Sequence, residues 1–461
     1  MERILTSQPE RGCFAHGDSP VALAEHVVRQ AMDTFRAAEI SDYRFAISVE
    51  GARTYCASGQ ACTENEIAST PAAHTQIACL IRPLMAAVAL ELAQDGRLDL
   101  RARIGNLLPE LSTDGKGALI QVQHLISNTA GYMGYSRMPA AHAFSDRAAA
   151  LIAISRAPQI FWPGLVYSYD NSAPTMLGEI LANISKRTIP DLVEELIFSP
   201  LGIKSRAPQA EDEGIPVQAS SFSKKYTENR SLFASLLSFP DLVRFVESLM
   251  GDVADGRKTT GLSIPTLKAL RRPVVAIPRT TSSSASRLLP TAYGLGLEVF
   301  QNGFVGYDTS TGSQANGFRF DRTRQIAVVL STSGRFRSFR RALLGRLVEL
   351  LGDATNPTQD AAVERHDESN LTVGEIVGDY FGDHSFHASV RQRDGSIVFT
   401  VHSAGGGRLE LWGQKGKNGD LHFDSKVPGA EPTFFRYSRT GEACVMFGMY
   451  ALKRLPTLSF F

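Results

Sequence analysis

Apolar residues recur at helical spacing in the stretch 76–92. Leu80, Leu84, Val88 and Leu92 are four residues apart, so they fall along one side of a helix. Pro83 is compatible with the first turn, because its missing N–H leaves little unsatisfied there. Gly96 follows the periodic run and marks the expected end. The pattern predicts a buried helix.

Alternating and short apolar runs predict strands on both sides of this helix. Two strands over 43–49 and 53–58 are joined by a turn at Glu50-Gly51, and further strands follow at 292–300, 317–320 and 325–331. Helices are expected between them, over 174–186, 221–250 and 263–270, and after them over 339–351. Because strands from both ends enclose helices, we predict an α+β, three-layer fold with one sheet built from both ends.

The pattern changes after residue 351. Residues 352–370 are polar and read as a linker. Short strands at 396–401, 408–412, 421–423 and 444–447, separated by Gly, Asn and Asp, predict a small all-β, barrel-like domain. The expected division is a lead segment at 1–19, a main domain at 20–351, the linker at 352–370 and the β domain at 371–461.

Charge and cysteine usage narrow the function classes. Lys plus Arg number 48 and Asp plus Glu 47, a net charge of +1, which gives no general attraction to nucleic acid or membranes. No apolar run reaches membrane-spanning length, and the N-terminus lacks the apolar core of a signal peptide. The five cysteines are odd in number and match no metal-site spacing. We expect a cytoplasmic protein with free thiols, a small-molecule substrate, and no metal or cofactor.

Cys79 is the first candidate for chemistry, because it lies at or just before the predicted helix N-terminus. Unpaired N–H groups and the positive helix end favour a thiolate there, and Arg82 shares the same face. Cys79 is therefore a candidate nucleophile, with a buried, inert thiol as the alternative. Arg82 is expected either to pair with Asp308 or Asp170, or to anchor a substrate.

Four motifs occur in a set order and together carry a resemblance. They are Ile77-Ala78-Cys79-Leu80-Ile81-Arg82, ending in Gly96-Arg97-Leu98-Asp99-Leu100; His124-Leu125-Ile126-Ser127-Asn128-Thr129-Ala130-Gly131; Pro163-Gly164 followed by Tyr169-Asp170-Asn171 and Leu177-Gly178; and Pro200-Leu201-Gly202-Ile203. Over about residues 20–350 the chain resembles the serine β-lactamase-like hydrolases, which include β-lactamases, penicillin-binding proteins and esterases, in their AmpC-type branch. Residues 371–461 resemble the lipocalin-like domain appended to many of them.

The resemblance implies an acylated nucleophile, with Cys-x-x-Arg standing where the family has Ser-x-x-Lys. The family's third motif falls on Tyr307-Asp308-Thr309, where its usual residues are lost. The resemblance also assigns the oxyanion-holding N–H groups to Cys79 and Ser310. Arg82 cannot act as a base, because a guanidinium keeps its proton near neutral pH.

The remaining roles follow from the same resemblance. Tyr169 becomes the candidate acid toward a leaving group, and Asn171 a group that orients the substrate carbonyl or the nucleophile. Tyr307, Asp308, Thr309 and Ser310 are expected to line the substrate pocket. We therefore predict an acyl-transfer enzyme, a hydrolase or transacylase acting on a small ester, thioester, amide or lactam. The alternatives are a pseudoenzyme that binds a ligand or partner, and a repurposed pocket for non-acyl cyclisation or acid/base chemistry in specialised metabolism.

Overall fold

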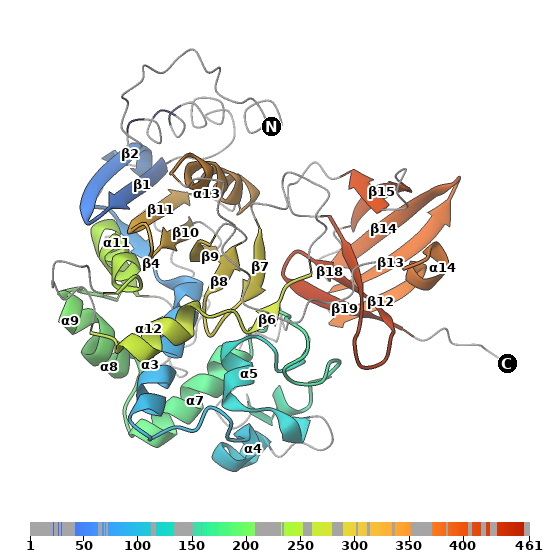
Figure 1. Cartoon of the computed structure of the whole chain (residues 1–461), viewed down its shortest axis with the longest axis horizontal. Coiled ribbons are helices and arrows are strands. Elements are labelled where there is room, and N and C mark those ends of the chain that lie inside the picture. Colours follow the sequence, from blue (N-terminus) through green and yellow to red (C-terminus); the bar gives the residue numbers. More distant parts are fainter. Residues whose placement is uncertain are drawn as a thin grey trace. The chain divides into compact units, whose positions relative to one another are not determined.

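The structure is a computed structural model of the whole chain (Figure 1). It describes residues 22, 26, 29, 42–62, 67–68, 70, 72–111, 117–132, 151–152, 154–157, 159–207, 232, 235–251, 261–278, 289–300, 303–310, 314–333, 337–351, 371–383, 386–403, 408–415, 421–424 and 431–455. The predicted lead segment and linker lie outside this part of the chain.

Two compact units make up the chain. The first unit comprises Met1–Asp95, Ser185–Arg271 and Gly296–Asp360, and the second comprises Gly96–Ile184, Arg272–Leu295 and Ala361–Phe461. The C-terminal β region thus groups with residues 96–184. None of the described helices has the length and apolar character that a bilayer span requires.

The first unit is built on an antiparallel sheet with strand order β3-β2-β1-β11-β10-β9-β8. The strands are β1 (Asp42–Val49), β2 (Ala52–Cys62), β3 (Ile67–Ala68), β8 (Glu298–Phe300), β9 (Val305–Ser310), β10 (Gln314–Asp321) and β11 (Ile326–Ser333). Glu50 and Gly51 both have positive φ, of 51° and 84°, as a tight two-residue hairpin turn requires. The sheet therefore joins segments from both ends of the chain, as predicted.

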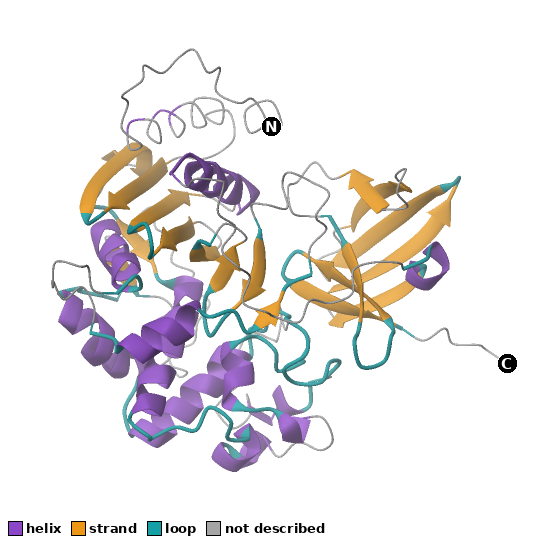
Figure 2. Cartoon of the chain, in the orientation of Figure 1, coloured by secondary structure: helices purple, strands orange, loops and turns teal. Residues whose placement is uncertain are grey.

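Helices cover both faces of this sheet (Figure 2). On one face lies α13 (Arg337–Leu351), whose Leu344 and Arg340 surround Gly317 of β10. On the other lies α11 (Phe239–Ser248), where Glu247 accepts a hydrogen bond of 2.6 Å from Ser48 of β1. The other elements of this unit are β4 (His74–Gln76), η1 (Ala78–Leu80), α3 (Ile81–Gln94), α8 (Ile189–Val193), η5 (Glu194–Phe198), α9 (Ser199–Leu201), β5 (Leu236–Ser238) and α12 (Ile264–Arg271).

Two sequence predictions in these parts need correction. Residues 236–238 form strand β5, paired with β4, where a helix was expected. The strand expected over 292–300 is interrupted, because Gly296 has a φ of 101° and packs so closely on α3 that a Cβ would lie 2.5 Å from the Cβ of Ala86.

The second unit begins with short helices and ends with a large sheet. Its first part contains α4 (Ile104–Leu107), η2 (Pro109–Leu111), η3 (Gly117–Leu119), α5 (Val122–Ile126), α7 (Ala173–Ser185), β6 (Val275–Ala276) and β7 (Pro290–Tyr293). The C-terminal part contains α14 (Val373–Ile376), β12 (Gly378–Asp383), β13 (Phe386–Arg393), β14 (Ser396–Ser403), β15 (Arg408–Lys415), β16 (Leu421–Asp424), β17 (Thr433–Arg436), β18 (Ala443–Phe447) and β19 (Tyr450–Arg454).

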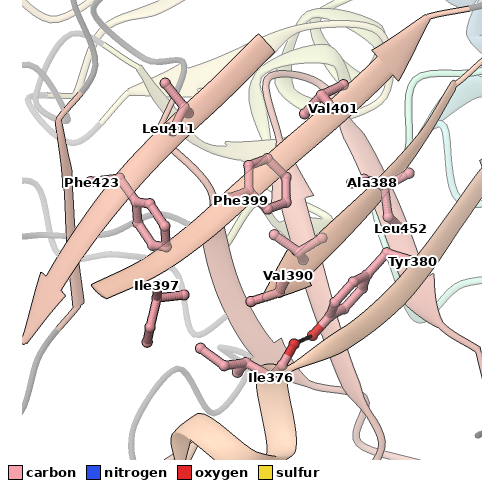
Figure 3. Packing of buried hydrophobic residues seen from close by; sticks show 11 residues of the cluster. Ile376, Tyr380, Ala388, Val390, Ile397, Phe399, Val401, Leu411, Phe423 and Leu452 are labelled. Carbon is pink, nitrogen blue, oxygen red and sulfur yellow. Dashed lines mark hydrogen bonds between the residues drawn. The ribbon is translucent and has the colours of Figure 1, made fainter. Parts of the chain in front are cut away.

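The C-terminal sheet is antiparallel and curls around its own core (Figure 3), with strand order β16-β15-β14-β13-β12-β19-β18-β17. Phe399 is at the centre of this core, with Val390, Phe423 and Leu452 around it. Tyr380 lies at its edge and donates its hydroxyl to the carbonyl of Ile376, at 2.7 Å. The predicted α+β class is confirmed, with a curled half-barrel sheet in the C-terminal region. The likeness to lipocalin-like domains remains a prediction.

Candidate functional site

The segment that leads to Cys79 is fastened to the sheet of the first unit. The N–H of Gln76 donates to the side-chain oxygen of Gln314, and the amide of Asn316 donates to the carbonyl of Gln76, both at 3.1 Å. The N–H of Ile77 donates to the carbonyl of Ser235 at 2.9 Å. Because both backbone groups of Gln76 are held by β10, the start of the following turn has a fixed position.

Cys79 lies on a strained turn at the head of α3. Ala78 has a φ of 47°, a conformation that costs a non-glycine residue free energy and is concentrated at functional sites. Cys79 belongs to the short turn η1, and α3 begins two residues later at Ile81. The Cys79 side chain is half-buried, and Arg82 is buried in the first turn of α3. The predicted helix start at Cys79 is therefore confirmed.

The structure brings Cys79 together with one predicted pocket residue, Thr309 of β9. The backbone N–H of Cys79 donates a hydrogen bond to the Thr309 hydroxyl oxygen at 3.0 Å. Thr309 and Tyr307 are each 2% exposed and have the same parity along β9, whereas Ser310 is half-buried. Alternation along the strand sends Tyr307 and Thr309 to one face and Asp308 to the other.

The Asp308 carboxylate lies in a buried ion network with three arginines. Arg319 of β10 contacts both of its oxygens, at 3.0 and 3.1 Å, Arg341 of α13 donates to one oxygen at 2.8 Å, and the Nε of Arg340 is 3.7 Å away. The side chain of Asp308 is 2% exposed. These ion pairs account for Asp308 without a substrate, so the geometry favours a structural role over the predicted substrate contact.

Glycine makes room for this ion network. A Cβ at Gly317 would lie 2.7 Å from a carboxylate oxygen of Asp308 and 2.7 Å from Leu344, closer than side chains tolerate. Gly317 is the β10 partner of Asp308 in the strand register, so the two residues face α13 together. The absence of a side chain at Gly317 therefore allows the Asp308 carboxylate to meet the arginines.

Glu298 is a buried acid beside this network that the sequence analysis did not single out. Its side chain is 2% exposed, and one of its oxygens lies 4.0 Å from Arg341. Its other oxygen has no hydrogen-bond partner among the described residues. Burial, together with the Asp308 charge, raises the pKa of Glu298 to about 7, against the attraction of the arginines. No local sequence pattern distinguishes Glu298, because its neighbours are ordinary strand residues.

Asp308 behaves in the opposite way. Burial raises the pKa of its carboxyl, but the guanidinium groups of Arg319, Arg340 and Arg341 outweigh burial and hold that pKa well below its ordinary value. The two neighbouring carboxyls thus differ: Asp308 carries a negative charge, and Glu298 holds a proton below about pH 7.

Tyr169 and Asn171 belong to the second unit, on the loop that precedes α7. Tyr169 is buried, and its backbone N–H donates to the carbonyl of Met449 at 2.9 Å. Its ring meets that of Tyr450 edge to face, with centroids 6.2 Å apart. Asn171 is exposed. The turn between β18 and β19 therefore contacts both the backbone and the ring of Tyr169.

A second turn of the C-terminal sheet holds the beginning of the same loop. The Tyr437 hydroxyl accepts a hydrogen bond of 3.0 Å from the N–H of Trp162, and its ring meets Phe161 edge to face. The guanidinium carbon of Arg439 lies 3.6 Å from the centre of the Trp162 ring. Two turns of the C-terminal sheet thus hold the loop from Phe161 to Tyr169. No sequence pattern predicted these contacts.

One histidine from the predicted motifs and two further cysteine side chains lie in the described part of the chain. Burial lowers the pKa of His124 to about 4, and its Nδ1 accepts a hydrogen bond of 3.1 Å from the N–H of Gln121. Cys444 is buried in the C-terminal sheet, and burial raises the pKa of its thiol. Cys56, in β2, is half-buried like Cys79.

Comparison with curated proteins finds two relatives at low identity. A D-aminopeptidase from Gluconobacter oxydans (strain 621H) is 27% identical over 164 residues, which cover 34% of this chain and 30% of the relative. Esterase EstB from Burkholderia gladioli is 27% identical over 146 residues, covering 28% and 37%. The chain thus spans about a third of the length of each curated relative it matches.

Solved structures resemble the fold over most of the chain. SurE, in its complex with D-Leu, has a TM-score of 0.67 at 20% identity and covers 94% of this chain and 100% of its own. The octameric penicillin-binding protein homologue from Pyrococcus abyssi has a TM-score of 0.60 at 16% identity, covering 94% and 99%. At this identity the likeness shows the fold.

A family model described as Beta-lactamase matches residues 25–352, which is most of the chain. This range contains the turn at Cys79, the loop at Tyr169 and the ion network around Asp308. The matched length, together with the shared fold, shows that this chain belongs to the beta-lactamase family.

Proposed function

We propose that the chain is an acyl-transfer enzyme with Cys79 as its nucleophile, a hydrolase or transacylase that acts on a small ester, thioester, amide or lactam. One observation carries the proposal: Cys79 is half-buried on a strained turn at the head of α3, directly after Ala78 with its φ of 47°. Arg82, one turn further along the chain from the Cys79 thiol, is a buried permanent cation in the first turn of α3. A cytoplasmic setting would keep that thiol reduced.

The proposed reaction needs no base at position 82. The Cys79 thiolate attacks the acyl carbon, a carbon–sulfur bond forms, and an electron pair moves onto the carbonyl oxygen. When that pair returns, the bond to the leaving group breaks. The leaving group departs with its bonding electrons and takes a proton from water. Water or an acceptor alcohol, thiol or amine then releases the acyl group from sulfur.

Two lines of evidence support acyl transfer over the other predicted chemistries. The relatives named above include an aminopeptidase and an esterase, names that denote the cleavage of amide and ester bonds. The non-acyl alternative would use Asp308 as one of its working groups. The arginines that surround Asp308 weigh against this alternative, because they keep the carboxylate ionised and buried.

A pseudoenzyme is the second candidate, and the hydrogen bond between Cys79 and Thr309 favours it. The backbone N–H of Cys79 already has an acceptor, so it is less able to donate to the oxyanion of a transition state. In this alternative the family pocket binds a ligand or partner without turnover, and Cys79 carries no acyl group.

The test is acyl capture on the purified full-length protein. The protein is incubated with p-nitrophenyl acetate and with phenyl thioacetate, and the Cys79 peptide is examined by mass spectrometry. We expect acetylation of Cys79 and release of the chromophore, both abolished in Cys79→Ala. The matched control is Cys56→Ala, because Cys56 is equally half-buried but lies in a strand. If Cys79 stays unmodified and turnover persists in Cys79→Ala, the proposed role of Cys79 as the nucleophile is refuted.

A further inference from the structure

The hydroxyl oxygen of Thr309 accepts a hydrogen bond from the backbone N–H of Cys79, a donor that could otherwise stabilise an acyl oxygen. Attack of a thiolate on a carbonyl carbon leaves negative charge on the oxygen, which requires N–H donors about 2.7–3.1 Å away. The nucleophile's own N–H, at the start of a helix, is such a donor. Here it already donates to Thr309, at 3.0 Å.

The backbone of Thr309 is held by β10 and by a side chain of α13. Thr309 pairs with Asn316 in the register of β9 and β10, and its carbonyl accepts a hydrogen bond of 2.8 Å from Arg340. The preceding residue, Asp308, is fixed by its ion pairs with the arginines. Rotation of the Thr309 side chain about χ1 is the movement that remains.

The partner of this hydrogen bond is equally constrained. Gln76 is bound through both its N–H and its carbonyl to side chains of β10, and Ile77 is bound to Ser235. The N–H of Cys79 is therefore presented at a fixed point, and a substrate oxygen has to replace the Thr309 hydroxyl at that point.

We propose that Thr309 is a gate over the nucleophile: its hydroxyl satisfies the Cys79 N–H in the free protein, and acylation requires the hydroxyl to rotate away so that the substrate oxygen takes the bond. This inference rests on the proposed function for its catalytic consequence. The hydrogen bond itself, and its effect on the exposure of the Cys79 amide, do not depend on any reaction.

The matched variants are Thr309→Ala, which removes the hydroxyl, and Thr309→Ser, which keeps it. With p-nitrophenyl acetate, Thr309→Ala should acylate Cys79 about five to ten times faster than the wild type, the effect of one competing neutral hydrogen bond. Thr309→Ser should stay within about twofold. Alkylation of Cys79 by iodoacetamide should change in neither variant, because displacement of iodide forms no oxyanion. A change in alkylation would indicate a disturbed thiol and would overturn the gate.

Hydrogen exchange at the Cys79 amide tests the gate without any acyl donor. We expect exchange about tenfold faster in Thr309→Ala and unchanged in Thr309→Ser. Thr332→Ala, another buried threonine of the same sheet, serves as the control and should leave this amide unaffected.

The outcomes separate the two proposals. Exchange that is the same in wild type and Thr309→Ala overturns the gate, whatever the kinetics. Faster exchange without acylation of Cys79 in any variant supports the hydrogen bond and refutes the proposed function. Slower acylation in Thr309→Ala overturns the gate as well, because Thr309 would then act as a donor to the transition state. Acylation confined to Thr309→Ala supports the gate in its strictest form.

Discussion

Glu298 should make the stability of this protein fall as the pH rises. Its pKa lies at about 7 in the folded protein, against an ordinary value of 4.5. Between these values the folded protein holds a proton on Glu298 that the unfolded chain has released, so the free energy of unfolding decreases with increasing pH. The contribution is fully present below about pH 4.5 and is lost as the pH passes through about 7.

The size of the effect follows from the shift in pKa. A pKa difference of one corresponds to about 1.4 kcal/mol, so a rise from 4.5 to about 7 represents about 3 kcal/mol. Burial is the main cause and the neighbouring Asp308 charge the second. Glu298→Gln removes the ionisation while keeping the shape of the side chain. Relative to wild type, this variant should therefore gain about 3 kcal/mol between pH 4.5 and pH 8.

Urea unfolding followed by far-ultraviolet circular dichroism, at pH 4.5, 5.5, 6.5, 7.5 and 8, measures the difference. Glu50→Gln is the control, because Glu50 is an exposed acid in the same unit. A pH slope in Glu298→Gln equal to that of the wild type would refute the reasoning. Asp308→Asn gives an independent check. Without the Asp308 charge, the three arginines should lower the pKa of Glu298. The loss of unfolding free energy caused by Asp308→Asn should therefore be about 3–5 kcal/mol at pH 5 and smaller at pH 8.

Three other predictions follow from the structure. Gly317→Ala should lower the free energy of unfolding by about 1–3 kcal/mol, because the new methyl group would lie 2.7 Å from an Asp308 oxygen; urea unfolding that is unchanged would contradict this. Tyr437→Phe should lower the free energy of unfolding by about 1–3 kcal/mol, because the Trp162 N–H loses its acceptor. Faster amide exchange confined to the Trp162 loop would show that this hydrogen bond is lost. Nitrocefin should not be turned over at the rate of a working β-lactamase, since Arg82 cannot take up a proton; rapid hydrolysis would refute this.

The sequence by itself determined the features that depend on neighbours along the chain. The turn at Glu50-Gly51 and the helix after Cys79 were predicted from local residue types, because turn conformation and helix starts are decided within a few residues. The order of the motifs likewise indicated the family, which the match over residues 25–352 shows.

Only the tertiary structure decided what the candidate residues contact. Asp308 and Thr309 are adjacent in the chain, yet one meets arginines of β10 and α13 while the other meets Cys79. Alternation along a strand predicts that neighbours point to opposite faces, but which face meets which helix depends on how the sheet packs. The raised pKa of Glu298 likewise depends on burial beside Asp308, ten residues distant in sequence, because desolvation is a property of the packed core and not of local sequence.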